Sequence, residues 1–163
     1  MKIVGPVDGH LFVDTSALVK RQVAEVGHVW VKSLCRPGAR HTIVISELAE
    51  VEVIASYCRM VRETPPRLTR ANRNRLIIRF RQQVQRRYVV APVDRGIITR
   101  AADLCRTHPL RAYDAIQLAC ALTRRDDDVA DGLPAPTFVC ADTALLAAAA
   151  AEGLAIENPN SHP

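Results

Sequence analysis

Short apolar runs alternate with longer segments of mixed polarity along this chain, and Gly, Pro and charged clusters separate them. The apolar runs predict strands over residues 10–14, 42–45, 88–92, 137–141 and 154–157. The segments between them predict helices over residues 15–35, 46–63, 69–87, 95–107, 111–125 and 143–152. The charged, Gly- and Pro-containing segment RRDDDVADGLPAP reads as a surface loop. Strands that alternate with helices predict an α/β fold with a parallel sheet covered on both faces.

Helix ends follow from individual residues. Ser46 and Asp94 are expected to cap the helices that they precede. Pro37 ends one helix, and Thr64-Pro65-Pro66 separates the next two. The two helices flanking Thr64 are therefore expected to form a helical hairpin that projects from the sheet.

The length of 163 residues fits a single domain over residues 1–163, large enough to bury a core without disulfides. Five dispersed cysteines, odd in number and without a C-x-x-C pair, indicate a reducing cytoplasm. The longest apolar run, Ala144 to Ala151, is far shorter than the ~18 residues of a membrane span. We therefore expect a cytoplasmic protein without a membrane partner.

Positive charge is concentrated in the expected hairpin. The net charge is +5, and ten arginines lie between Arg59 and Arg87 against one acid, Glu63. One interpretation is a solvated helical arm, and the other is a surface that contacts phosphates or a partner. On the second interpretation the candidate contacts are Arg73, Arg75 and Arg79.

Familiar catalytic and nucleotide-binding patterns do not occur. The chain has no G-x-G-x-x-G, G-x-x-x-x-G-K-[ST], H-E-x-x-H or G-x-S-x-G segment, and its histidines lack metal-ligand spacing. Any chemistry is therefore expected from carboxylates.

Two aspartates end apolar strands just before helices: Asp14 in LFVDTSALVK and Asp142 in TFVCADTALLAA. In open α/β sheets the ligand crevice lies outside the carboxyl ends of the strands, so these residues are candidates for one acidic site. Asp114 is the third candidate, in the first turn of an otherwise apolar helix. Each aspartate has a structural alternative, because Asp caps helices and is favoured at their amino ends.

A fourth acid lies in ISELAEVEV, where Glu47, Glu50 and Glu52 compete. Glu47 falls in the first turn, where the helix dipole alone explains an acid. Glu52 aligns at helical spacing with polar residues of a solvent-facing stripe. Periodicity does not choose among the three.

The segments LFVDTSALVKR, VEV, LRAYDAIQLACAL and FVCADTALLAAAAAEGLAIENPN, in this order, resemble the PIN domain, and in particular the VapC-like toxins of prokaryotic toxin–antitoxin pairs. The resemblance covers nearly the whole chain. It selects Glu52, because the family's second acid falls in a V-E-[VL] segment. Ala49-Glu50 stands where a Thr-Arg or Thr-Gly pair is more usual, so Glu47 remains the alternative.

The resemblance implies a three-layer α/β/α fold with a central parallel sheet, and four acids that gather at its carboxyl edge around Mg²⁺ or Mn²⁺. Asp14 and Asp114 are then the direct metal ligands. Glu52 and Asp142 complete the shell or position the attacking water, and Ser16 and Thr15 support the ligands through hydrogen bonds. Oxygen-only ligands suit Mg²⁺ or Mn²⁺ better than zinc.

The implied function is that of a metal-dependent ribonuclease toxin with an RNA substrate, a cognate antitoxin and a homodimeric state. Two alternatives share the fold: a stand-alone PIN nuclease of RNA processing, and a catalytically weak module that binds RNA or a partner. A plain α/β scaffold would require several coincidental acids at the sheet edge.

Overall fold

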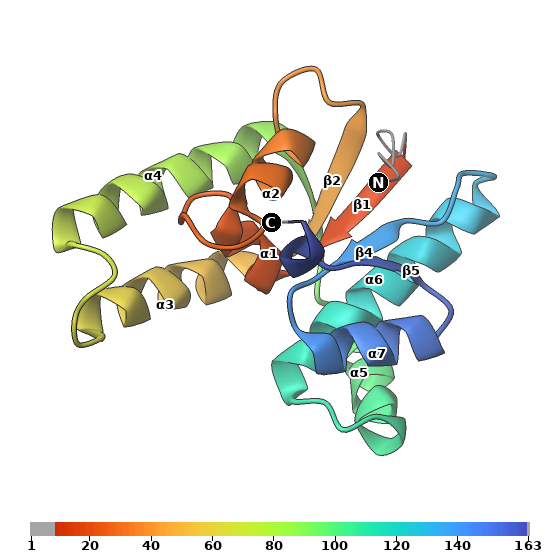
Figure 1. Cartoon of the computed structure of the whole chain (residues 1–163). Helices are drawn as coiled ribbons and strands as arrows, with labels where there is room; N and C mark the ends of the chain where they lie inside the picture. The colour runs from red at the N-terminus through yellow and green to blue at the C-terminus, as the bar shows by residue number, and fades with distance from the viewer. Residues whose placement is uncertain (1–8, 163) are drawn as a thin grey trace.

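A computed structural model describes residues 9–162 of the chain. Its centre is a five-stranded, all-parallel sheet with the strand order β3-β2-β1-β4-β5 (Figure 1). The strands are β1 (Gly9–Val13), β2 (His41–Ser46), β3 (Tyr88–Ala91), β4 (Thr137–Val139) and β5 (Ala155–Glu157). The helices are α1 (Thr15–Lys20), α2 (His28–Leu34), α3 (Ala49–Arg62), α4 (Arg70–Arg87), α5 (Arg95–Thr107), α6 (Ala112–Ala130) and α7 (Thr143–Ala151), followed by the short 3-10 helix η1 (Pro159–Ser161).

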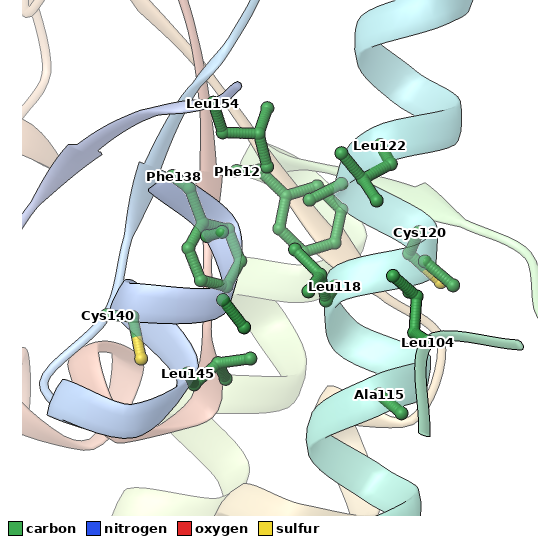
Figure 2. Close-up of a cluster of buried hydrophobic side chains, with 14 of the residues drawn as sticks. Phe12, Leu104, Ala115, Leu118, Cys120, Leu122, Phe138, Cys140, Leu145 and Leu154 are labelled. Atoms are coloured by element: carbon green, nitrogen blue, oxygen red, sulfur yellow. The ribbon is translucent and has the colours of Figure 1, made fainter. Parts of the chain in front are cut away.

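The alternation of side chains along β1 places a hydrophobic core on each face of the sheet. Leu11 and Val13 face a core shared with α1 to α4, whereas Phe12 faces a core shared with α5, α6 and α7. Figure 2 shows the second core, in which Phe12 stacks on Phe138 with ring centroids 5.9 Å apart. The expected three-layer α/β/α arrangement is therefore confirmed.

The parallel register brings the carboxyl ends of the central strands to one edge of the sheet. Leu11 pairs with Ile43 in β2 and with Thr137 in β4, so β1, β2 and β4 end close together. The backbone N–H of Asp14 continues this ladder by donating to the carbonyl of Val139 at 2.9 Å. The segments that follow these strands thus start from one crevice.

Helices α3 and α4 form the expected arginine-rich hairpin, which extends away from the sheet in Figure 1. The Thr69 hydroxyl caps α4 by accepting from the Asn72 N–H at 3.1 Å. Arg81 pairs with Glu50 at 2.8 Å and links the two helices. Phe80 is the one residue of α4 that is buried, which explains the mainly polar sequence of this helix.

The single helix expected over residues 15–35 is wrong, because the chain turns between α1 and α2. Gly27 has φ +83°, and a Cβ there would approach the Pro159 carbonyl oxygen to 2.3 Å. The buried Lys20 ammonium holds the turn by donating to Glu25 Oε1 at 3.2 Å and to the Val26 carbonyl at 3.0 Å. These contacts come from tertiary packing, which helical periodicity does not report.

Two further expectations about helix ends are wrong. Ser46 is the last residue of β2 and not a cap; α3 begins at Ala49 after Leu48. The helix expected to end at residue 125 continues, so residues 126–130, expected in a surface loop, are helical and α6 ends at Ala130. Asp94 caps α5 as expected, accepting from the Ile97 N–H at 2.9 Å. Within residues 9–162, none of the helices has the length and apolarity needed to cross a bilayer.

Candidate active site

Asp14 lies immediately after β1 and caps α1. Its Oδ2 atom accepts from the Ser16 N–H at 2.9 Å and from the Ser16 hydroxyl at 2.6 Å. The same oxygen faces the Cys140 thiol at 3.5 Å. Asp14 is only 6% exposed, and a short network of donors holds its carboxylate at the carboxyl edge of the sheet.

Glu52 lies in the first turn of α3 and reaches the same crevice. Its Oε2 atom accepts from the Thr15 hydroxyl at 2.8 Å and from the Gln117 side-chain amide. Gln117 also approaches Thr15 at 3.3 Å, so the three side chains form a closed set from α1, α3 and α6. Glu47 lies elsewhere, because its carboxylate accepts from the Val93 N–H at 3.0 Å. The structure thus places Glu52, not Glu47, beside Asp14.

The other two candidate acids lie at the starts of helices α6 and α7. Asp142 is exposed and caps α7, with its Oδ1 accepting from the N–H groups of Ala144 at 2.8 Å and Leu145 at 3.0 Å. Asp114 is half-buried in the first turn of α6, close to Arg111.

Electrostatic repulsion connects the four acids. Burial raises the pKa of Glu52 above its ordinary value, and the charges of Asp14 and Asp114 raise it further, although hydrogen bonds from Thr15 and Gln117 oppose the rise. Burial likewise raises the pKa of Asp114, with added repulsion from Asp14 and Asp142. The four carboxylates thus lie within one electrostatic field, as expected when like charges share a site.

Three of these acids bond to protein donors through only one of their two oxygens. Within residues 9–162, the donors reach Oδ2 of Asp14, Oε2 of Glu52 and Oδ1 of Asp142, and the other oxygen of each carboxylate receives no hydrogen bond. Each side chain is therefore anchored and still keeps a free oxygen. This is how a carboxylate that binds an external cation is commonly supported.

The donor set fits a hard divalent cation that keeps part of its water. In the described part of the chain, no three His, Cys, Asp or Glu side chains come together closely enough to enclose an ion by themselves. Mg²⁺ usually binds through one or two carboxylates and retains several waters. A cation between Asp14 and Asp114 would also relieve the repulsion that raises the pKa of Asp114.

Two residues of the crevice were missed from the sequence. Gln117 is 1% exposed, and its Oε1 atom has no hydrogen-bond partner among the described residues. Its spacing from Asp114, one helical turn, was a usable signal, because residues three apart share a helix face.

Cys140 is fully buried, and burial raises its thiol pKa, so the group stays protonated beside Asp14. Nothing in the sequence distinguishes it from an ordinary core cysteine.

The arginines singled out on the hairpin lie away from this crevice. Arg73 donates to Asn74 at 2.9 Å and Arg75 to Asn72 at 2.7 Å, both on the surface of α4 itself. Arg79 lines a hollow between α4 and the α1–α2 region. The hairpin is thus not one uniform surface.

Comparison with known proteins assigns the fold to a family. Residues 11–130 match the PIN domain. The chain belongs to the PIN domain family. The matched range includes Asp14, Glu52 and Asp114, whereas Asp142 lies beyond it. PIN domains are generally nucleases. No curated protein sequence matches the chain.

Solved structures with the same PIN fold have little sequence identity to this chain. A toxin–antitoxin complex from Klebsiella pneumoniae aligns with TM-score 0.60 and 17% identity, covering 91% of this chain and 97% of that chain. FitAcB from Neisseria gonorrhoeae aligns with TM-score 0.54 and 17% identity, over 91% and 97%. VapBC2 from Rickettsia felis, bound to a DNA fragment from their promoter, aligns with TM-score 0.56 and 12% identity, over 91% and 98%.

Proposed function

We propose that this PIN domain is a metal-dependent endoribonuclease and the toxin of a toxin–antitoxin pair. The observation that carries the proposal is the convergence of Asp14, Glu52, Asp114 and Asp142 at the carboxyl edge of the sheet, with raised pKa values for Glu52 and Asp114. Mutual repulsion of this kind is costly for a scaffold and useful in a site that recruits a cation.

Asp14 and Asp114 are the proposed ligands of Mg²⁺ or Mn²⁺. When bound, such a cation activates a water for attack on a phosphodiester and neutralises charge on the departing oxygen. The chain's own contribution begins with Ser16, whose two hydrogen bonds fix Asp14 Oδ2, while Oδ1 receives no hydrogen bond among the described residues. The first N–H groups of α7 likewise donate to Asp142 Oδ1 only.

Glu52 is the proposed base. Thr15 and Gln117 fix its Oε2, so Oε1 remains to accept a proton from the attacking water. Burial raises the pKa of Glu52, and a carboxylate with a higher pKa is the better proton acceptor near neutral pH. Thr15 and Gln117 act as positioning residues, because they touch Glu52 and not the reacting atoms.

RNA is the proposed substrate, and the basic hairpin is proposed to draw it or a partner through Arg73, Arg75 and Arg79. The net charge of +5 supports an anionic ligand, although the acid cluster itself repels phosphate until a cation is present. The five free thiols are in keeping with a cytoplasmic enzyme. The structural neighbours, which include toxin–antitoxin complexes, support a cognate antitoxin. A homodimer stays a prediction.

The test is cleavage of total cellular RNA by the purified protein with Mg²⁺, with Mn²⁺ or with EDTA. The Asp14→Asn variant, purified in the same way, reports contaminating nuclease. Cleavage that needs the metal and is lost in the variant would support both the activity and the site. Equal cleavage by the variant, or no cleavage with either metal, would contradict the proposal and favour a binding module.

A further inference from the structure

A second polar hollow, separate from the acid crevice, lies between α4, the end of α1 and the segment that follows α2. Its volume is about 450 Å³. Six cationic side chains line it, namely Arg21, Lys32, Arg36, Arg79, Arg86 and Arg87. The remaining lining is mostly glutamine, and it includes no acid. We refer to this set of residues as the basic hollow.

The six cations of the basic hollow are not neutralised within the protein. Within residues 9–162, none of them lies in an ion pair with a carboxylate. Elsewhere on the same hairpin, Arg67 and Arg81 do have acidic partners. Uncompensated like charges around a concave surface repel one another and concentrate a positive potential there, which favours an anionic ligand.

The floor of the basic hollow is pre-organised. Arg21 donates to the Tyr88 hydroxyl and to the Cys35 carbonyl at 3.3 Å, and its guanidinium lies 5.5 Å from the centre of the Tyr88 ring. The Gln22 amide donates to Gln83 at 2.9 Å and ties the end of α1 to α4. These contacts fix one wall, while the rim residues Arg36 and Arg86 are exposed and free to meet a ligand.

Helix α1 connects the basic hollow to the acid crevice. Asp14 caps the first turn of α1 and Arg21 caps its last turn. The two caps are seven residues apart, and at a rise of about 1.5 Å per residue they are separated by roughly 10 Å. Residues Ala17 to Lys20 of α1 are buried, so the acids and the basic hollow lie near opposite ends of a covered helix.

We infer that the basic hollow binds the phosphodiester backbone of RNA. Arginine presents a fork of donors that matches two phosphate oxygens, and five of the six cations are arginines. The hollow offers no aromatic side chain on which a base would stack, so it holds the backbone and carries no base preference. The choice of RNA rests on the proposed ribonuclease function.

An acidic peptide fits the basic hollow less well than RNA. Protein partners are anchored mainly by buried aromatic and apolar side chains in pockets. Pro37 and Cys35 are the only non-polar residues in the lining. Inside the basic hollow an acidic segment would therefore gain charge contacts without an apolar anchor, the nearest apolar lining being Leu68 and Leu76 in an adjoining hollow, whereas a nucleic-acid backbone needs only the charges.

The test measures equilibrium binding of a single-stranded oligouridylate in EDTA, where the proposed cleavage is suppressed, over a range of salt concentrations. The variant carries Arg36→Gln, Arg79→Gln and Arg86→Gln, all at exposed positions. The control carries Arg59→Gln, Arg70→Gln and Arg106→Gln, which are also exposed and remove the same charge. Circular dichroism melting verifies that both variants are folded.

Loss of three phosphate contacts makes the plot of log affinity against log salt shallower by about 2, since each contact on a single strand contributes about 0.7. A fourfold rise in salt then costs the unmodified protein about 16-fold more affinity than the variant. The control is expected to retain most of the original slope. Equal slopes for the variant and the control would overturn the inference.

Two competitors identify the ligand class. Tripolyphosphate is expected to displace the oligouridylate only weakly, because it fills one part of an extended site. Calorimetric binding of tripolyphosphate that the three substitutions abolish, together with an unchanged RNA slope, would assign the hollow to a soluble polyphosphate. Tighter binding of polyglutamate than of RNA would assign it to an acidic protein segment. Either result would overturn the RNA assignment.

The experiment separates this inference from the proposed catalytic function. RNA binding that depends on the basic hollow in a protein that cuts no RNA would support the hollow and contradict the nuclease. Metal-dependent cleavage, together with RNA binding that the three substitutions leave unchanged, would support the nuclease and contradict the assignment of the hollow to RNA.

Discussion

At the scale of single residues, Asp114 is the acid whose removal best separates function from stability. It makes no cap for α6, and repulsion from Asp14 and Asp142 adds to the burial that raises its pKa. We expect Asp114→Asn to reduce metal-dependent RNA cleavage at least ~100-fold, since it removes a proposed ligand. The melting temperature in EDTA should stay the same or rise, by about 2–4 °C for each kcal/mol of repulsion relieved.

The matched control is Asp103→Asn, which removes an exposed acid on α5. It should change neither cleavage nor the melting temperature, because surface substitutions of this kind usually have small effects. Full activity in Asp114→Asn would contradict the site assignment. A large fall in its melting temperature would instead show that Asp114 has a structural role.

The same variant tests the pH dependence. The folded protein holds the Asp114 proton to a higher pH than the unfolded chain does, so it binds more protons in the window above the ordinary pKa of 3.8. Ionised Asp114 therefore lowers the free energy of unfolding as the pH rises through this window. We expect the stabilisation by Asp114→Asn, measured by urea unfolding in EDTA, to be absent at the acid end and to grow toward neutral pH. If the difference in the free energy of unfolding between the variant and the unmodified protein stayed constant or fell as the pH rose, the electrostatic account would be contradicted.

The sequence predicts the acids of this site unevenly. Asp14 and Asp142 were recognisable because each ends an apolar strand, and strand ends of a parallel sheet meet at one edge. Periodicity alone did not select Glu52, since its distinction from Glu47 depends on a contact with Thr15, 37 residues away in sequence; the family resemblance selected it. Gln117 was overlooked because an amide carries no charge signal.

At the scale of elements, the carboxyl half of α6 depends on a buried ion pair. Asp128 is 1% exposed; Arg124 pairs with it at 2.7 Å, one helical turn away, and His10 of β1 contacts it at 2.7 Å. We expect Arg124→Ala to lower the free energy of unfolding by about 3 kcal/mol, because it leaves a buried carboxylate with only a histidine. The melting temperature should fall by roughly 6–12 °C.

Arg106→Ala serves as the control for Arg124→Ala. Its nearest acid, Asp103, is 3.9 Å away, and both side chains are largely exposed. An exposed pair of this kind contributes about 0–1 kcal/mol. Equal melting temperatures for the two variants would show that the Asp128 pair does not hold α6.

The elements mispredicted from the sequence share one cause. Residues 126–130 read as a loop because of their charges, yet they are helical, and Asp128 among them contacts His10, which is 118 residues away in sequence. Residues 15–35 read as one helix, yet α1 ends at Lys20 and Gly27 has φ +83°, a left-handed conformation that an α-helix cannot pass through. Elements with local signals, such as the Asp94 cap of α5, were predicted well.

At the scale of the whole molecule, charge is divided between two places. The acids gather at the carboxyl edge of the sheet, whereas the basic hollow lies by the amino end of β3, which Arg86 and Arg87 directly precede. Under the two proposals above, the acids carry out the reaction and the basic hollow holds part of the RNA backbone. A toxin built in this way should act on cellular RNA without a separate RNA-binding domain.

Expression in a bacterial host tests that expectation on the intact protein. We expect induction of the unmodified chain to arrest growth, because cleavage of cellular RNA removes templates or components of translation. Asp14→Asn, accumulated to the same level, should leave growth unaffected, since the proposed metal site is lost. Co-expression of the product of an adjacent small gene should restore growth, and that product should co-purify with the toxin.

Unimpaired growth with a protein that cleaves RNA in vitro would contradict the toxin assignment and favour a stand-alone nuclease of RNA processing. Arrest by Asp14→Asn as well would show that the effect does not come from the acid cluster.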